Sequence, residues 1–535
     1  MRVVVADKIS PRGMEQLARS GWQVEAPTPG ALRAALADAD ALIVRSATRV
    51  TAELIAAAPR LRVVGRAGAG VDNIDVDACT RRGILVMNTP GTNAVSVAEH
   101  TFALMLSLAR QVPRLAAASH AGRWEKGGAM GSELRGKTLG LVGLGRVGFN
   151  VARRAHAFEM RVVAFDPYVS PEVAREEDVE IVPFDDLLAR ADCVSLHASL
   201  GPGTEKLFNA ATLAKMKRGA WLINTARGEM LDESALADAL RSGQLAGAAL
   251  DVFSVEPPKD SPLTGLPNVI ATPHVAGSTV EAQEEVGVLI AEQVFDYLDS
   301  GVLRNSVNLP NLSPEQYRRL RPYLELAERL GLFAAQVARG RVARVRIRYA
   351  GETAVVVYTV LRSAVLAGLL NPVLDEKVNL VSSAAVAAQR GIVVEEQTRR
   401  REHGFPDTLE VTIFPHDAAA VCVEGTVPYD LSPRITGIDG IHVECDLEGT
   451  ILFTRNRDVP GVIGGMGQLL GSHGINIATF ALGRRDAAPG AEALALIRLD
   501  GDVPESVLEP IRSIAAVVEA RLVRLPRKDA PEASQ

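Results

Sequence analysis

Short apolar runs alternate with amphipathic segments over the first 90 residues of the chain. The runs at 2–7, 41–46, 61–68 and 85–90 are rich in Val, Ile and Leu, and the segments between them repeat their apolar positions with helical spacing. Apolar strands separated by helices are typical of a parallel sheet that is covered on both faces. The pattern therefore predicts that the chain begins with an α/β unit.

A second α/β unit follows a long amphipathic helix, which is predicted from Ala94 to about Leu115. Apolar strands recur over 138–272, and another long helix is predicted over 278–301. Two units joined by two long helices predict that the second is inserted into the first, with a cleft between the carboxyl ends of their strands. The predicted fold class is α/β, with a Rossmann domain at 96–282 inserted in a flavodoxin-like domain at 1–95 and 283–310.

The pattern changes after about residue 310. Residues 311–448 mix amphipathic helices with alternating strands, one of them predicted at 353–360, and contain no chemical motif. Residues 449–525 follow the order βαββαβ, which is a ferredoxin-like arrangement. The tail, 526–535, is predicted to be disordered. We therefore expect two further α+β domains in the second half of the chain.

Composition adds to this picture by excluding some classes of protein. A net charge of −6 and a pI near 6.0, without a dense Lys/Arg cluster, argue against a nucleic-acid partner. The longest apolar runs are far shorter than a membrane span. We therefore expect a cytoplasmic protein of several domains with no membrane partner.

A glycine-rich turn between a predicted strand and a predicted helix indicates a nucleotide site. Gly143, Gly145 and Gly148 form the pattern GxGxxG directly after "TLGLV". The first glycine permits the tight turn, the second lets the backbone approach a pyrophosphate, and the third lets helix and strand pack closely. The amides at the start of the helix would then bind the phosphates.

Asp166 decides which dinucleotide is expected. It ends the next predicted strand, "RVVAFD", where its carboxylate would accept hydrogen bonds from the ribose hydroxyls. The same carboxylate would repel a 2′-phosphate, so the predicted cofactor is NAD and not NADP. Arg146 in the turn works against this preference, because an arginine can pair with that phosphate.

Three segments place a polar side chain just beyond a predicted strand of the second unit. They are "INTARGEM", "LDVFSVEPP" and "ATPHVAGST", which supply Arg227, Glu256 and His274. Arginine binds a carboxylate through a planar fork, and histidine accepts a hydroxyl proton near neutral pH. A neighbouring carboxylate orients the imidazole and stabilises its charged form. The set fits hydride transfer from a 2-hydroxy acid.

Each of these three residues has an ordinary alternative. Arg227 alone would be a surface charge, Glu256 before two prolines would belong to a turn, and His274 would be a loop histidine bonded to backbone. Their occurrence together at equivalent strand ends favours the catalytic interpretation. No metal site is predicted.

Several longer motifs resemble the D-isomer-specific 2-hydroxyacid dehydrogenases. They are "GLGRVG", "NTARGE", "AALDVFSVEPP" and "TPHVAGST". Within that family, "IVRSATRVT", "VGRAGAGVDNID" and "GILVMNTPGTNAVSVAEHT" are similar to the phosphoglycerate dehydrogenases over about residues 1–310. The rest of the chain resembles the long form of those enzymes, with an intervening domain at 311–448 and a C-terminal ACT domain at 449–525.

The resemblance implies oxidation of D-3-phosphoglycerate to 3-phosphonooxypyruvate, the first step of phosphorylated L-serine synthesis. It implies that Arg227 and Glu256 are catalytic and that His274 donates and accepts the proton. Besides the glycines, the cofactor positions that it implies are Arg146, Val147, Asp166, Thr225, Ala226, Asp251 and Gly277. The substrate contacts that it implies are Arg45, Ser46, Gly70 within the loop 68–73, and Asn93.

The ACT resemblance implies a homo-oligomer, a dimer or a tetramer, with a small effector bound between subunits. Asp458 would hold an ammonium group, and Asn476 of a neighbouring subunit would bond a carboxylate or hydroxyl. L-Serine, the product of the pathway, is the expected ligand. The alternative is that this domain only assembles the oligomer.

Two other functions stay open at this point. A glyoxylate/hydroxypyruvate reductase, or another D-2-hydroxyacid dehydrogenase, would share the core motifs. A dinucleotide-sensing binding protein on the same scaffold would not need the intact set of Arg227, Glu256 and His274.

Overall fold

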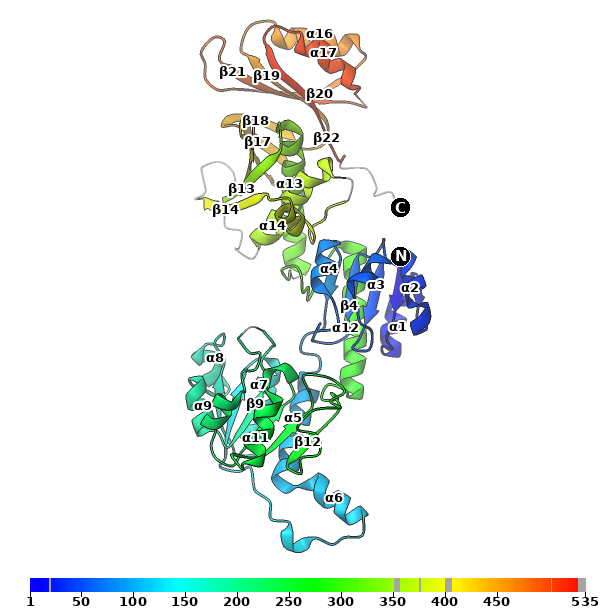
Figure 1. The fold of residues 1–535 in the computed structure, drawn as a ribbon. Helices are drawn as coiled ribbons and strands as arrows, with labels where there is room; N and C mark the ends of the chain where they lie inside the picture. Colours follow the sequence, from blue (N-terminus) through cyan, green and yellow to red (C-terminus); the bar gives the residue numbers. More distant parts are fainter. Residues whose placement is uncertain are drawn as a thin grey trace.

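The computed structural model describes residues 1–18, 21–201, 203–312, 314–350, 357–374, 377–399, 407–501 and 503–527. In these ranges the chain forms four units, each built on one sheet. They lie in an extended row in which the first unit stands between the second and the third (Figure 1). No helix there combines the length and the apolar character that crossing a bilayer requires. Most of the predicted disordered tail, from 528 on, lies outside the described residues.

The first unit is a five-stranded parallel sheet in the order β2-β1-β3-β4-β5, which is the flavodoxin-like order that the sequence predicted. Helix α12, far along the chain, returns to this unit, and its Ile290 and Val294 share a core with Val3, Ile43 and Val63. The strands and helices of the unit are β1 (Arg2–Val5), α1 (Pro11–Ala18), β2 (Gln23–Glu25), α2 (Leu32–Ala35), β3 (Ala41–Val44), α3 (Ala52–Ala56), β4 (Val63–Arg66), α4 (Val76–Arg81), β5 (Leu85–Met87) and α12 (Val280–Ser300).

The second unit is a seven-stranded parallel sheet in the order β12-β11-β10-β9-β6-β7-β8, which is the Rossmann order with one added strand. The strands between its two edge strands, β8 and β12, are almost continuously buried, as their apolar sequences predicted. Its elements are α5 (Ala94–Arg110), α6 (Val112–His120), β6 (Thr138–Val142), α7 (Arg146–Ala157), β7 (Arg161–Phe165), α8 (Pro171–Glu176), β8 (Glu180–Ile181), α9 (Phe184–Arg190), β9 (Cys193–Leu196), α10 (Ala210–Lys215), β10 (Ala220–Asn224), α11 (Glu233–Arg241), β11 (Leu245–Leu250) and β12 (Val269–Ala271).

The long helix predicted from Ala94 to Leu115 is two helices. Gln111 adopts a left-handed backbone with φ of 51°, which ends α5, and α6 starts in a new direction. The cause is Pro113, because a proline ring inside a continuous helix would collide with the carbonyl four residues earlier. The α6 segment extends away from the second unit (Figure 1).

The third unit is a mixed sheet in the order β14-β13-β15-β16-β17-β18 with two long helices on one face. The strand predicted at 353–360 is wrong where the structure describes it, because Tyr358 begins α14. That helix is apolar on nearly all sides and is buried against α13, so burial decides its conformation. The elements are α13 (Pro314–Val337), β13 (Val342–Ala350), α14 (Tyr358–Leu370), α15 (Ser383–Gln389), β14 (Val393–Arg399), β15 (Thr408–Pro415), β16 (Val421–Thr426), β17 (Arg434–Ile438) and β18 (Ile441–Asp446).

The fourth unit has the ferredoxin-like order β20-β21-β19-β22, as predicted. Phe453 of its central strand meets Phe333 of α13 edge to face, with ring centroids 6.3 Å apart, which joins the third and fourth units through one core. The elements are β19 (Gly449–Arg457), α16 (Val462–Ser472), β20 (Ile477–Arg484), β21 (Glu492–Leu499), α17 (Leu508–Arg512) and β22 (Val517–Leu525).

Helices α1 and α12 cross in direct backbone contact within the first unit. A Cβ atom added to Gly13 would lie 2.5 Å from the carbonyl oxygen of Gly287, which leaves no room for any side chain. This crossing matters because α12 is the helix through which the chain returns from the second unit.

We expect Gly13→Ala to lower the free energy of unfolding by about 1–3 kcal/mol, because the added methyl group must displace the backbone of α12. Gly30→Ala is the control, since nothing lies within 4 Å of a Cβ atom at that position. Thermal denaturation followed by tryptophan fluorescence measures the difference. Equal melting temperatures for the two variants would contradict this account of the crossing.

Candidate active site

The two segments that connect the first and second units lie side by side. One contains Asn93, just before α5, and the other contains Gly277, just before α12. A Cβ atom on Gly277 would lie 2.7 Å from the side-chain nitrogen of Asn93, and the hydroxyls of Ser96 and Thr279 are 2.8 Å apart. The carboxyl ends of the two parallel sheets are therefore held near a common crossing point, where ligands of α/β proteins bind.

The glycine turn after β6 has the geometry that GxGxxG predicted. Gly143 has φ of 95°, and a Cβ atom there would lie 2.6 Å from the backbone nitrogen of Ala198. A Cβ atom on Gly148 would lie 2.4 Å from the carbonyl oxygen of Gly143, so that helix α7 packs tightly on the turn. Nothing lies within 4 Å of a Cβ atom at Gly145, so this position is open to an approaching phosphate.

Asp166 follows β7 and lies beside the glycine turn. Its Oδ2 accepts a hydrogen bond of 2.8 Å from the amide of Leu144, and its Oδ1 accepts one of 2.8 Å from the amide of Tyr168. Each carboxylate oxygen has a further lone pair, so the group can still accept bonds from ribose hydroxyls. The residues of this corner fit a dinucleotide.

The two other predicted residues of the turn, Arg146 and Val147, differ in their surroundings. Arg146 is exposed, and its guanidinium donates a hydrogen bond to the carbonyl of Pro90, which belongs to the connection between the units. Val147 is half-buried and packs against the core of the second unit. Arg146 is therefore placed where it can meet either the connecting segment or a bound phosphate.

Arg227 is aimed by the turn that follows β10. The fully buried Asn224 accepts a hydrogen bond of 3.0 Å from the amide of Ala226 and donates one of 2.8 Å to the carbonyl of Arg227. The hydroxyl of Thr225 is 3.0 Å from that of Thr101 on α5. These bonds fix the turn, so the direction of the arginine side chain follows from the backbone.

The guanidinium of Arg227 reaches the first unit. Its Nε donates to Oδ2 of Asp72 at 3.0 Å, and a Cβ atom on Gly70 would lie 2.1 Å from its Nη2. The loop 68–73 can approach this cation because Gly70 has no side chain. The predicted arginine of one unit and the predicted substrate loop of the other are therefore in contact.

His274 and Glu256 form the second predicted pair. Nδ1 of His274 lies 2.9 Å from Oε2 of Glu256, and Oε1 of Glu256 accepts a hydrogen bond of 3.1 Å from the amide of Phe253. The imidazole is 53% exposed, so its Nε2 edge is free to meet a ligand. A carboxylate on Nδ1 sets the tautomer in which Nε2 can accept a proton.

Asp251 holds the backbone that carries His274. Its fully buried carboxylate accepts hydrogen bonds from the Thr272 hydroxyl at 2.6 Å and from the amides of Val275 and Ala276 at 2.9 and 2.8 Å. Burial opposes ionisation of this group, but those bonds and one from His100 outweigh it and hold the pKa of Asp251 below its usual range. The carboxylate stays charged and the loop stays in place.

Arg66 is a cation of this site that the sequence analysis did not single out. It is the last residue of β4, and a Cβ atom on Gly68 would lie 1.6 Å from its Nη1, so its guanidinium lies against the substrate loop. Burial, and then the neighbouring Arg227, lower the pKa of Arg66, while Asp72 opposes that shift. The sequence feature that could have identified Arg66 is its place at the end of a predicted strand, within "VGRAGAG".

Arg45 and Ser46 lie at the end of the neighbouring strand, β3. The amide of Arg45 donates to Oδ2 of Asp7 at 2.6 Å, and its guanidinium donates to the carbonyl of Lys8 at 3.2 Å. Ser46 is exposed. Arg45 is also close enough to contribute to the lowered pKa of Arg66, after burial and Arg227. The site thus gathers three arginines.

The two predicted effector residues lie in the fourth unit and are not brought together within one chain. Asp458 pairs at 3.1 Å with Arg484, which is the last residue of β20. Asn476 directly precedes the first residue of that strand and donates a hydrogen bond of 2.6 Å to Asp500. At about 3.3 Å per residue, the length of β20 separates them by roughly 25 Å. A single small molecule cannot contact both side chains of one protomer.

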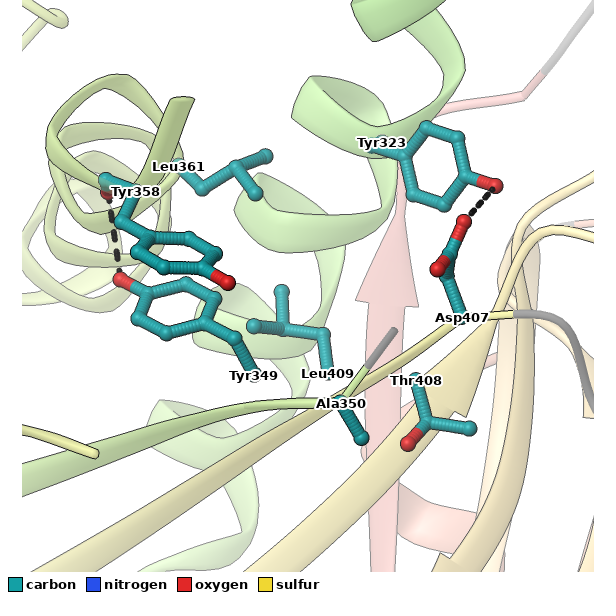
Figure 2. A pocket seen from close by; sticks show the side chains of 8 residues that line it. All are labelled: Tyr323, Tyr349, Ala350, Tyr358, Leu361, Asp407, Thr408 and Leu409. Atoms are coloured by element: carbon teal, nitrogen blue, oxygen red, sulfur yellow. Dashed lines mark hydrogen bonds between the residues drawn. The ribbon is translucent and has the colours of Figure 1, made fainter. Parts of the chain in front are cut away.

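A small cavity in the third unit is a further place where a ligand could be considered. Figure 2 shows Tyr323, Tyr349 and Tyr358 around it, with Tyr323 donating to Asp407 at 3.1 Å and Tyr349 to the carbonyl of Tyr358 at 3.2 Å. Its volume of about 20 Å³ accommodates a group the size of one water molecule. We attribute it to packing around a buried polar network, because it has no room for a metabolite.

Comparison with known proteins identifies the families of three parts of the chain. The profile of the D-isomer specific 2-hydroxyacid dehydrogenase NAD binding domain matches residues 102–276, that of the D-3-phosphoglycerate dehydrogenase intervening domain matches 319–439, and that of the ACT domain matches 450–516.

Two relatives match over nearly their whole length. The D-3-phosphoglycerate dehydrogenase of Archaeoglobus fulgidus is 40% identical over 98% of this chain and 100% of its own. The protein of the same name from Bacillus subtilis is 38% identical over the same shares, 98% and 100%.

Solved structures match somewhat more than half of the chain. The TT0316 protein of Thermus thermophilus is 38% identical, with a TM-score of 0.53 over 57% of this chain and 100% of its own. The NAD-dependent formate dehydrogenase of Staphylococcus aureus in complex with NAD is 30% identical, with a TM-score of 0.52 over 57% of this chain and 98% of its own. With its intervening and ACT domains following a Rossmann core, this chain belongs to the D-isomer-specific 2-hydroxyacid dehydrogenases and uses NAD.

Proposed function

We propose that this chain oxidises D-3-phosphoglycerate to 3-phosphonooxypyruvate with NAD as the hydride acceptor. The observation that carries the proposal is the meeting of Arg227 with the loop 68–73 of the first unit, next to the arginines of that unit. A substrate with a carboxylate at one end and a phosphate at the other needs cations from both units. The full-length relatives named D-3-phosphoglycerate dehydrogenase support the same choice.

The arginines of the site divide between the two acidic groups of this substrate. Arg227 binds the carboxylate, because it has a free Nη2 beside Gly70 while its Nε is held by Asp72. Arg45 and Arg66, at the ends of β3 and β4, bind the phosphate together with the backbone amides of the loop 68–73. Ser46 and Asn93 complete the set of polar contacts.

The proton of the substrate hydroxyl goes to Nε2 of His274. Glu256 on Nδ1 stabilises the imidazolium that forms, since their atoms are 2.9 Å apart. In the reverse reaction the same nitrogen returns the proton.

NAD, when bound, supplies the carbon that accepts the hydride. The open side of Gly145 and the start of α7 would hold its pyrophosphate, with Arg146 beside them. Asp166 would accept its ribose hydroxyls. The remaining surface of the NAD site would be formed by Gly143, Val147, Gly148, Thr225, Ala226, Asp251 and Gly277.

A second candidate function is reduction of glyoxylate or hydroxypyruvate. It is favoured by a glyoxylate reductase structure that is 32% identical, with a TM-score of 0.53 over 59% of this chain. Those substrates carry no phosphate, so they leave Arg45 and Arg66 without an anionic group to bind. A purely dinucleotide-sensing role is disfavoured by the His274–Glu256 pair, which sensing does not need.

The assay that separates these functions compares kcat/KM for D-3-phosphoglycerate with that for D-glycerate. We expect a preference of about 100-fold or more for the phosphorylated acid, because two charged hydrogen bonds of about 1.5–3 kcal/mol each are lost without the phosphate. Equal efficiency would reject the phosphoglycerate assignment in favour of the reductase.

Replacing the proposed proton acceptor tests the mechanism separately. We expect His274→Ala to lower kcat by about 10²- to 10⁴-fold, because general-base catalysis is lost, with little change in the Kd for NADH. The exposed His120, at the end of α6, gives the control variant His120→Ala. An unchanged kcat in His274→Ala would remove this residue from the mechanism.

We also propose the domain limits given by the sequence, because each sheet falls within one of them. A cytoplasmic location remains a prediction from the sequence.

For the ACT domain we propose a homo-oligomeric effector site for L-serine, formed by Asp458 of one copy and Asn476 of another. Two features support it: these residues lie at opposite ends of β20, and β20 is the edge strand of its sheet. An antiparallel pairing of two such edges would place Asn476 of each copy near Asp458 of the other.

Calorimetric titration of the full chain with L-serine tests this site, with D-serine as the matched control. We expect heat of binding for the L-isomer only, and its loss in Asn476→Ala, because one half of the site is removed. Absence of heat with L-serine would support the alternative that the domain only assembles the oligomer.

A further inference from the structure

Glu256 lies on the long connection between β11 and β12, which has no secondary structure of its own in the region around it. Residue 256 can serve His274 only if this connection is held still, because an imidazole–carboxylate bond of 2.9 Å tolerates little movement. The hydrogen bond from the amide of Phe253 to Glu256 is local and does not anchor the loop to the sheet.

The anchor is Glu233, the first residue of α11. Its Oε1 accepts hydrogen bonds from the amide and the hydroxyl of Ser254, at 2.9 and 2.6 Å, and its Oε2 accepts one from the hydroxyl of Ser261. Ser254 and Ser261 stand on either side of Glu256. Both oxygens of one carboxylate therefore hold the two ends of the segment that carries Glu256.

The start of α11 lies a few residues after the turn that carries Arg227. A Cβ atom on Gly228 would lie 1.9 Å from the carbonyl carbon of Phe253, so the backbone after Arg227 packs directly on the backbone before Glu256. Glu233 follows this turn after one short 3₁₀ segment, Gly228–Met230. It thereby connects the segment of the substrate-binding cation to that of the carboxylate behind the histidine.

Glu233 is suited to this task because it stays charged. Burial opposes its ionisation, but the bonds from Ser254 and Ser261 outweigh burial and hold the pKa of Glu233 below its usual range. Hydrogen bonds to a charged acceptor are about twice as strong as those between neutral groups. Its position at the start of α11 adds a favourable interaction with the helix dipole.

We propose that Glu233 is a positioning residue for the hydride-transfer reaction: by clamping Ser254 and Ser261 it fixes Glu256, and through Glu256 the imidazole of His274. This inference rests on the proposed function, since it concerns the same catalytic pair. Glu233 touches neither substrate nor cofactor in it.

Steady-state kinetics of the full chain with D-3-phosphoglycerate and NAD tests the proposal. We expect Glu233→Ala to lower kcat by about 100-fold, the loss typical of a catalytic group displaced by about 1 Å, while the Kd for NADH stays near the wild-type value. Glu172→Ala is the matched control, because Glu172 is also in the first turn of a helix of the same unit but is exposed.

The conservative variant separates hydrogen bonding from charge. In Glu233→Gln the amide oxygen can accept both bonds from Ser254, and the amide nitrogen can donate to the Ser261 hydroxyl. We expect kcat within about threefold of wild type, since only the extra strength of the charged bonds is lost. A loss as large as in the alanine variant would show that the charge, and not the clamp, matters, and would overturn the proposal.

A double-mutant cycle with Glu256→Gln gives the decisive result. If Glu233 acts through Glu256, the variant Glu233→Ala/Glu256→Gln is no slower than Glu256→Gln alone, to within about twofold. Effects that multiply would overturn the proposal, as would a normal kcat in Glu233→Ala. A wild-type enzyme without activity on phosphoglycerate would instead reject the proposed function, and this inference with it.

Discussion

The site depends on one constraint: the chain passes between its first two units twice, and the two passages are fixed to each other. Asn93 and Gly277 are in contact, and Ser96 and Thr279 join the starts of α5 and α12. Residues from distant parts of the sequence can meet only because these passages hold two sheet edges near one another. The contact of Arg227 with Asp72 follows from that arrangement, since each residue stands at the carboxyl end of its own sheet.

Within the second unit, two hydrogen-bonded carboxylates, one buried and one half-buried, hold irregular loops in place. Asp251 holds Thr272, Val275 and Ala276 around His274 and is fully buried, so the energy of its hydrogen bonds is not diluted by water. Glu233, which is half-buried, holds the loop of Glu256 through its hydrogen bonds with Ser254 and Ser261. The proposed catalytic pair, His274 and Glu256, is therefore exposed to ligands, while the carboxylates that hold its loops are less exposed.

Sequence reasoning succeeded wherever one local pattern decides the structure. The GxGxxG turn, the parallel strands of the first two units, and the segments after β10, β11 and β12 that carry Arg227, Glu256 and His274 agree with apolar periodicity and with the backbone freedom of glycine. The hydrogen bonds that Asp166 accepts from the amides of Leu144 and Tyr168 could not be predicted from the motif.

It failed where packing between distant segments decides. The apolar stretch around Tyr358 has strand-like residues, but its burial against α13 makes it helical. The helix from Ala94 ends at Gln111 because of Pro113. This proline is visible in the sequence, but the apolar periodicity continues past it and predicted one helix. Arg66 was missed because its role depends on Gly68 and Arg227, which reach it only in the folded chain.

The connections of the C-terminal half decide how an effector bound there could reach the reaction. In the described part of the chain, the third unit meets the first through Asn379, whose side chain donates to the carbonyl of Gly83 at 2.7 Å, and through contacts of α15 with α4. Asn308, in the linker, bonds Val86 and Ile84 on either side of the start of β5. These bonds end on the unit that holds the substrate loop, whereas the glycine turn belongs to the other unit. An effector bound in the fourth unit would therefore reach the first unit before the second. Under the proposed function, its effect should fall on substrate binding by Arg45 and Arg66 before it falls on NAD binding.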